Sequence, residues 1–302
     1  MSKSKVATLG ILFVAFIWGT EFVLIHNAIV LLEPNSFNAV RFGSASLFIG
    51  ICLLFWNKSV GLSWPMVRHG CFLGLLLCLG FSLQTFGLLY TSVSNCAFIT
   101  SLSVLIVPLA AFLFLGERPR YLAIVGVCVA AIGLYILTTS GSTSFNLGDI
   151  LTLICAAMFA LHMVYTGKYS RQYEVLPLTL IQLVTVSILS FISALLFEDW
   201  GRLLDINVIG SFNVLLAVGI AAILGTALAI LIQTSAQGYL SSTRVALIFS
   251  LEPVFAALTA YLVLNEQLPA NAGVGAGMIL AGILLAEIHF QGNKEMVSVI
   301  GE

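Results

Sequence analysis

The chain has 302 residues, of which 60% are hydrophobic and 8% are charged, and its mean hydropathy is +1.10. A soluble domain carries about 25% charged residues, so this composition excludes an ordinary soluble protein and predicts an integral membrane protein. The net charge of −1 does not suggest a basic surface for nucleic acid. All six cysteines lie in apolar runs without C-x-x-C spacing, so we expect packing residues rather than disulfides or metal ligands.

The predicted elements are ten apolar runs, each near the length of about 20 residues that a helix needs to span a bilayer. In chain order we expect helices at 6–27, 36–56, 69–90, 93–115, 120–138, 147–167, 177–197, 208–235, 240–264 and 270–290. The first run lacks a small-residue cleavage site, so we interpret it as a retained helix rather than a signal peptide. The predicted fold class is an all-α integral membrane protein with ten transmembrane helices.

The distribution of basic residues predicts the orientation of these helices. With the N-terminus in the cytoplasm, all but two of the twelve Lys and Arg lie in or beside inner segments. The exceptions are Arg41, within a helix, and Arg202, in an outer loop. Because cytoplasmic loops accumulate Lys and Arg, we expect both termini in the cytoplasm and a location in the inner (plasma) membrane.

An internal repeat relates the two halves of the chain. QTFGLLYTS at Gln84–Ser92 returns as QTSAQGYLS at Gln233–Ser241, and the alignment extends without a gap over 80–137 and 229–286. Further identities pair Ala97 with Ala246, Glu117 with Glu266, Gly126 with Gly275, and Gly133 with Gly282.

We therefore expect two five-helix repeats, 1–140 and 141–302. Because five is an odd number, the second repeat enters the membrane from the opposite side, and the two form an inverted repeat. Many secondary transporters are built in this way and bind their substrate near the midplane, where the repeats meet.

Several segments resemble a known family. They are WGTEFV at 18–23, Pro34 with Arg41-Phe42, YTSVSNCAFITSLSVLIVPLAAFLFLGERP at 90–119 and SLEPVFAALTAYLVLNEQL at 250–268. In their order and spacing they resemble the drug/metabolite transporter superfamily, in its ten-helix EamA-like branch. The resemblance implies an inner-membrane carrier of small metabolites, often an exporter, with a central cavity between the halves. Such proteins usually have a small polar residue after WGT, where this chain has Glu21.

Glu21 and Arg41 are charges inside predicted membrane helices. At a rise of 1.5 Å per residue, both lie about 8–10 Å below the outer interface and can face one another. A charge near the bilayer centre costs about 2.5 kcal/mol or more, so such residues face a partner, a cavity or water. Three interpretations remain open: a structural ion pair, a split site for a charged ligand group, or an Arg41 side chain that extends to the interface.

Glu252 lies near the middle of the ninth predicted helix, beside Pro253, which is expected to kink that helix. A midplane carboxylate on a kinked helix between repeats is placed to bind substrate or a coupling proton. The alternative is a structural Glu252 that braces Arg244. The repeat counterpart of Glu252 is Ser103, so the repeat does not require an acid here.

The remaining candidate binding residues are polar or aromatic side chains within helices. Gln84 and Gln233 either bind ligand or hydrogen-bond between helices, and packing is the default explanation. His162 on the sixth helix is either a hydrogen-bonded structural residue or part of a proton relay. Tyr165 lies on the same helix, and Tyr90 is one of several aromatic residues that can line a cavity.

Catalytic and cofactor motifs are missing from the sequence. It contains no H-E-x-x-H, G-x-S-x-G or nucleotide-binding loop and no clustered His/Cys ligands, so we expect no enzyme, metal or cofactor. The preferred hypothesis is a secondary transporter that exports a small metabolite by alternating access. The alternatives are an intramembrane enzyme or sensor that uses Glu21, Glu252 and His162, and a passive channel.

A cavity that offers both Glu and Arg suits a zwitterion, because an amine pairs with carboxylate and a carboxylate binds Arg bidentately. An amino acid or related metabolite is therefore the first substrate hypothesis, followed by hydrophobic drugs and nucleotide-like metabolites. The expected partners are the substrate, the lipid bilayer and a coupling proton, with no nucleic acid and either a monomer or a homodimer.

Overall fold

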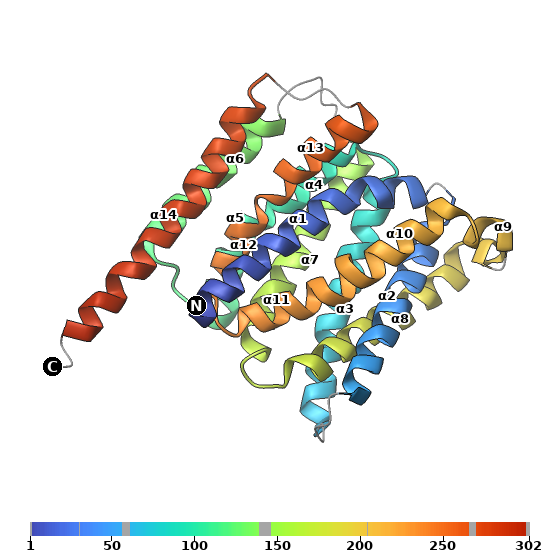
Figure 1. The fold of residues 1–302 in the computed structure, drawn as a ribbon, viewed down its shortest axis with the longest axis horizontal. Coiled ribbons are helices and arrows are strands. Elements are labelled where there is room, and N and C mark those ends of the chain that lie inside the picture. The colour runs from blue at the N-terminus through green and yellow to red at the C-terminus, as the bar shows by residue number, and fades with distance from the viewer. Residues whose placement is uncertain are drawn as a thin grey trace.

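A computed structural model describes residues 2–29, 31–55, 61–138, 146–203, 205–265 and 270–299. Within these ranges the regular elements are all helices, so the all-α prediction is confirmed (Figure 1). The expected repeat boundary at 140/141 lies outside the described residues, as does Glu266, the repeat counterpart of Glu117.

The helices follow the apolar runs closely. In chain order they are α1 (Lys3–Ile29), α2 (Pro34–Phe55), α3 (Trp64–Gly87), α4 (Val93–Ser101), α5 (Ser103–Leu115), α6 (Tyr121–Thr138), α7 (Leu147–Tyr169), α8 (Val175–Phe197), η1 (Trp200–Leu203), α9 (Ile206–Ile209), α10 (Phe212–Ala222), η2 (Ile223–Leu228), α11 (Ala229–Gln237), α12 (Ser242–Phe249), α13 (Glu252–Leu264) and α14 (Ala272–Val299).

Eight helical segments within the described residues are long and apolar enough to cross a membrane, so the protein is a multi-pass membrane protein. The other two expected spans, 120–138 and 270–290, fall on α6 and α14. Their apolar described parts are shorter, Tyr121–Ile136 and Ala272–Leu285.

Three of the ten expected spans are interrupted within the described residues. The fourth consists of α4 and α5, which meet at Leu102, and the ninth consists of α12 and α13, separated by Ser250 and Leu251. Pro253 cannot donate a hydrogen bond to the carbonyl of Phe249, four residues earlier, and α12 ends at that residue. The eighth span contains η2, a π-helical turn between α10 and α11, and such turns occur frequently at functional sites.

The arrangement places the broken helices at the centre of the molecule. Helices α6 and α14 lie side by side at one edge, while α2 and α8 pack together at the opposite edge (Figure 1). Between them, α1 packs on α11, α12 and α13, and the two broken spans contact one another, α4 against α13 and α5 against α12.

Glycines allow α6 and α14 to pack closely. A Cβ atom at Gly133 would lie 2.7 Å from the carbonyl oxygen of Gly275, and one at Gly282 would lie 2.5 Å from the carbonyl oxygen of Gly126. Small residues commonly allow this approach between membrane helices. The sequence pairs Gly126 with Gly275 and Gly133 with Gly282, so each helix uses the same two positions to contact the other.

Candidate functional site

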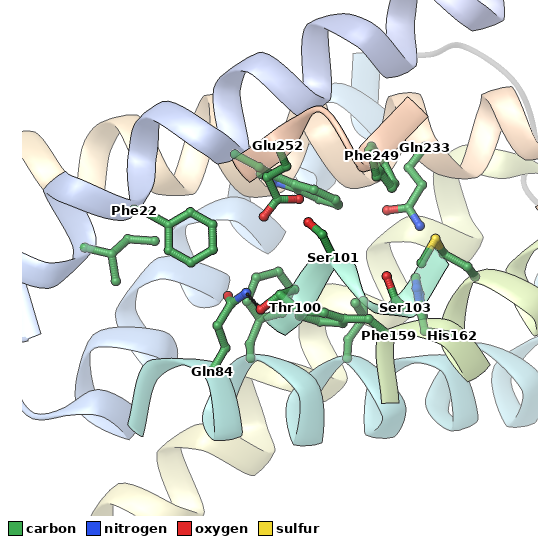
Figure 2. Close-up of a pocket in the computed structure, with 15 residues that line it drawn as sticks. Phe22, Gln84, Thr100, Ser101, Ser103, Phe159, His162, Gln233, Phe249 and Glu252 are labelled. Carbon is green, nitrogen blue, oxygen red and sulfur yellow. Dashed lines mark hydrogen bonds between the residues drawn. The ribbon is translucent and has the colours of Figure 1, made fainter. Parts of the chain in front are cut away.

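A cavity lies where the broken helices meet (Figure 2). Its volume open to the centres of water-sized molecules is about 40 Å³, within about 580 Å³ of non-atom space that includes open solvent. Its lining combines aromatic and polar side chains from both halves of the chain. The polar ones are Gln84, Thr100, Ser101, Ser103, His162, Gln233 and Glu252, and the aromatic ones are Trp18, Phe22, Phe81, Phe159 and Phe249.

Glu252 supplies the only carboxylate among the lining residues. It begins α13 directly after the helix break, where the helix dipole favours a negative charge. Its carboxylate points into the cavity and makes no hydrogen bond or ion pair within the described part of the chain (Figure 2).

The brace from Glu252 to Arg244 that the sequence suggested is not present. The Arg244 guanidinium donates hydrogen bonds to Ser4 Oγ at 3.1 Å and Thr8 Oγ1 at 3.0 Å, both on α1. Arg244 therefore ties the start of α12 to the start of α1, while the Glu252 carboxylate stays available to a ligand.

His162 lines the cavity and is held there by hydrogen bonds. Its Nε2 lies 2.9 Å from Gln182 Oε1 and 3.2 Å from Thr166 Oγ1. The amide nitrogen of Gln182 donates to the carbonyl oxygen of Leu178 at 3.2 Å, which identifies Oε1 as the atom that faces the imidazole. An amide oxygen only accepts hydrogen bonds, so Nε2 carries a proton and donates it to Gln182.

Two glutamines contribute further polar groups. Gln84 Nε2 donates to Thr100 Oγ1 at 3.2 Å, and Gln233 Nε2 donates to Gln237 Oε1 at 3.3 Å. The oxygen Gln233 Oε1 and the hydroxyl Ser101 Oγ are both buried and have no hydrogen-bond partner in the described structure. A buried polar atom without a partner costs about 1–3 kcal/mol, so these two atoms indicate a place for ligand or water.

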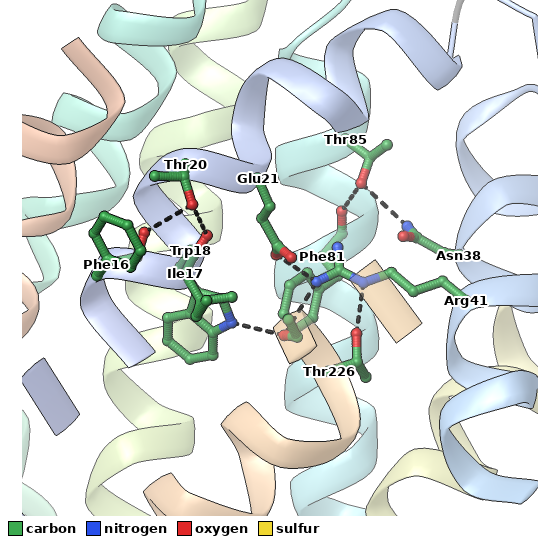
Figure 3. Close-up of polar contacts among 11 residues, drawn as sticks. Phe16, Ile17, Trp18, Thr20, Glu21, Asn38, Arg41, Phe81, Thr85 and Thr226 are labelled. Carbon is green, nitrogen blue, oxygen red and sulfur yellow. Dashed lines mark hydrogen bonds and ion pairs between the residues drawn. The ribbon is translucent and has the colours of Figure 1, made fainter. Parts of the chain in front are cut away.

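Glu21 and Arg41 form a buried ion pair beside the cavity (Figure 3). Arg41 Nη2 lies 2.6 Å from Glu21 Oε1, and the two side chains are only 1% and 4% exposed. Arg41 also donates from Nε to Thr226 Oγ1 at 2.6 Å and from Nη2 to the Gly225 carbonyl oxygen at 3.3 Å. Neither charged side chain lines the cavity, so the structural ion pair is the interpretation that this arrangement favours. Its burial is inconsistent with an Arg41 that reaches the interface.

Two aromatic residues connect the ion pair to the cavity. The Arg41 guanidinium lies 5.0 Å from the ring centre of Phe81, and Trp18 Nε1 donates to the Gly225 carbonyl oxygen at 2.7 Å. Both rings also line the cavity. Gly225 belongs to the π-helical turn η2, which brings this carbonyl oxygen and Thr226 toward Arg41.

The structure brings together half of the predicted binding residues. Gln84, His162, Gln233 and Glu252 line the cavity, and Glu21 and Arg41 lie beside it.

The two predicted tyrosines are not among the lining residues. Tyr90 follows the end of α3 and is 54% exposed. Tyr165 belongs to an aromatic cluster, with its ring 5.1 Å from Phe72 and 6.1 Å from Tyr169.

Thr100, Ser101 and Ser103 line the cavity and were not predicted from the sequence. A signal was present for Ser103, because it is the repeat counterpart of Glu252. Phe159 and Met163 also line the cavity, but no feature of the sequence distinguishes them from other apolar residues of α7. Within the described residues, no cluster of three or more His, Cys, Asp or Glu could hold a metal ion.

Comparison with known proteins places these features in a family. The sequence matches the EamA-like transporter family over residues 5–139 and 146–287. An "Uncharacterized transporter" of Archaeoglobus fulgidus is 34% identical over 95% of this chain and 87% of its own length. A protein of Escherichia coli K12 named "Probable amino-acid metabolite efflux pump" is 24% identical over 91% of this chain and 92% of its own.

A solved structure described as "Crystal structure of protein" has the same fold, with a TM-score of 0.77 at 18% sequence identity. The superposition covers 94% of this chain and 97% of that one. Together with the family match, these similarities confirm the resemblance to drug/metabolite transporters.

Proposed function

The chain belongs to the EamA-like transporter family, and on this premise we propose that it is a secondary transporter that moves a small metabolite by alternating access. The observation that carries the proposal is the central cavity. It lies at two helix breaks and is lined by buried polar groups that lack partners. Sites of this kind, where interrupted helices meet, are where secondary transporters bind their substrates.

We propose that the chain crosses the membrane ten times as two inverted five-helix repeats, 1–140 and 141–302. The reciprocal glycine contacts between α6 and α14 support this topology, because a two-fold relation exchanges the two contacts. The helix breaks support it as well, since Leu102 and Leu251 occupy matching positions in the repeat alignment. Rocking of one repeat against the other would then open the cavity to each side in turn.

We propose that the protein lies in the inner (plasma) membrane and that both of its termini face the cytoplasm. The proposal rests on the positive-inside pattern. Cysteines introduced one at a time at Asp199 and Gln172 test it, in a protein whose exposed Cys71 and Cys128 are replaced by Ser. Asp199→Cys should react with an impermeant maleimide added outside intact cells, and Gln172→Cys should react only after lysis. The opposite pattern would reverse the orientation.

An amino acid or related metabolite remains the first substrate hypothesis, and export is the proposed direction. The name of the Escherichia coli relative supports both. Glu252 is the proposed site of a coupling proton, because a carboxylate without a partner can exchange a proton for a ligand. Since the named relatives are transporters, we propose no catalytic reaction for the cavity.

The test uses proteoliposomes that contain only this protein. A thermal-shift screen of the purified protein against amino acids and their amine derivatives selects ligands, since a ligand at 100 times its dissociation constant stabilises the fold by about 2.7 kcal/mol. Each stabilising ligand is then loaded into the vesicles, and uptake of trace labelled ligand is followed. A carrier gives saturable counterflow. Non-saturable flux would indicate a channel, and chemical conversion of the ligand would indicate an enzyme; either result overturns the proposal.

A further inference from the structure

The charge of the cavity lining is one-sided. Glu252 supplies a carboxylate, and none of the lining residues is Lys or Arg. The nearby cation, Arg41, is bound to Glu21, to Thr226 and to the carbonyl oxygen of Gly225. A ligand carboxylate in this cavity would therefore lose its water without gaining a basic partner, and it would face the charge of Glu252.

The polar atoms that lack partners are mostly hydrogen-bond acceptors. They comprise the Glu252 carboxylate and Gln233 Oε1, carried by α13 and α11 (Figure 2). The Ser101 hydroxyl, which can accept or donate, also belongs to the cavity lining and has no partner in the described structure (Figure 2). An ammonium group offers three N–H donors and no acceptor, so it complements this set of atoms.

Aromatic rings surround the acceptors. Trp18 and Phe249 lie with their ring centres 4.9 Å apart, and Phe22 and Phe159 also line the cavity (Figure 2). Aromatic faces attract cations through their quadrupole and also provide an apolar surface. The cavity therefore offers a place for an organic cation with an apolar body.

Building on the proposed transport function, we propose that the cavity recognises a small amine with an apolar or aromatic body through its ammonium group, which pairs with Glu252. A second donor on the ligand, such as a hydroxyl or amide, would meet Gln233 Oε1. A free carboxylate on the same ligand weakens binding. The preferred ligands are thus amines and amino-acid derivatives without a free carboxylate, rather than the zwitterion itself.

Four matched probes test this inference: phenethylamine, phenylalaninol, phenylalanine and 3-phenylpropionate. They share an aromatic body and differ in the ammonium and carboxylate groups. Their binding to the purified full-length protein is measured at pH 7 by calorimetry and thermal shift. We expect the two amines to bind about tenfold or more tightly than phenylalanine, and 3-phenylpropionate not to bind. Absence of binding by both amines would overturn the inference, as would equal or tighter binding by either carboxylate.

Variants at Glu252 test whether this residue binds the ammonium group of the ligand. Glu252→Gln should weaken binding of both amines about tenfold or more, because it removes a charge-assisted hydrogen bond. Glu117→Gln removes the same charge from an exposed loop and should leave the affinity unchanged. Glu252→Asp keeps the negative charge and serves as the test if Glu252→Gln does not fold. The Glu252→Asp protein should still bind the amines more tightly than phenylalanine. Unchanged amine affinity in Glu252→Gln, or loss of the preference in Glu252→Asp, would refute the assignment.

Counterflow of the same probes separates this inference from the transport proposal. Amines that bind but show no counterflow would leave the recognition inference standing and remove the carrier proposal. Saturable counterflow of phenylalanine with no preference for the amines would support a carrier and overturn the inference.

Discussion

The ion pair between Glu21 and Arg41 should be worth far more than an ordinary surface pair. The two charges are 2.6 Å apart and almost fully buried. Glu21→Gln removes the negative charge and leaves a buried guanidinium whose other bonds go to the neutral groups of Thr226 and Gly225. Removing one partner of a buried pair costs about 3–5 kcal/mol, because the remaining charge is uncompensated.

The double variant provides the decisive comparison. Replacing both residues, as in Glu21→Gln with Arg41→Met, removes both charges, and such exchanges are often close to neutral. We therefore expect the double variant to be more stable than either single variant, with a coupling energy of several kcal/mol. Denaturant unfolding in detergent micelles, followed by tryptophan fluorescence, measures the four proteins of the cycle.

The pair between Glu33 and Arg202 serves as the matched control. Its atoms lie 4.0 Å apart, and its side chains are 31% and 48% exposed. Exposed pairs contribute about 0–1 kcal/mol, so the same substitutions there should show little coupling. If the buried cycle gave a coupling as small as this control, the argument for a structural ion pair would fail. Ligand contact would then become the better explanation for Glu21.

Two further predictions concern the same region. Gly225→Ala should destabilise the protein by about 1–3 kcal/mol, because the new Cβ would overlap Glu21 Oε2 and lie 2.8 Å from Glu21 Oε1. Gly219→Ala should not destabilise it, because the space around Gly219 is open. Equal unfolding free energies for the two variants would contradict this packing. Binding of phenethylamine, which stays protonated from pH 5 to 8 as lysine does, should strengthen as pH rises, because the ionised Glu252 carboxylate binds the cation and a proton competes with it. Calorimetry at several pH values checks this, and a pH dependence of the same size in Glu252→Gln would assign it to another group.

The sequence predicted the helices well because lipid solvation leaves a direct mark on composition. A helix that crosses the hydrocarbon needs about 20 apolar residues, and the expected runs differ from the observed helices mainly at their ends. It also predicted a kink at Pro253, because proline removes a backbone donor regardless of tertiary contacts, and the structure has a helix break just before Glu252. The break at Leu102 has no such local signal, and only the repeat alignment points to it.

The sequence could not predict that Glu21 and Arg41 pair with each other outside the cavity while Glu252 lines it. Glu21 and Arg41 could be placed at similar depth from the helical rise, which correctly suggested that they meet. Their separation from the cavity depends on Gly225, Thr226 and the π-helical turn that positions them, nearly two hundred residues along the chain. Tyr165 illustrates the same limit, because its neighbours in the aromatic cluster determine which way it faces.

The two aligned segments of the sequence, 80–137 and 229–286, contain similar helix breaks but different chemistry. Ser103 and Glu252 occupy matching positions, each begins the helix after its break, and both line the cavity. A strictly symmetric cavity would hold two facing carboxylates, which repel unless one is protonated or a cation lies between them. With Ser at the first position, a single carboxylate remains to be neutralised. One ligand ammonium or one proton is enough to do so, so the proposed mechanism predicts that the two bind alternately and that one proton is exchanged for each amine.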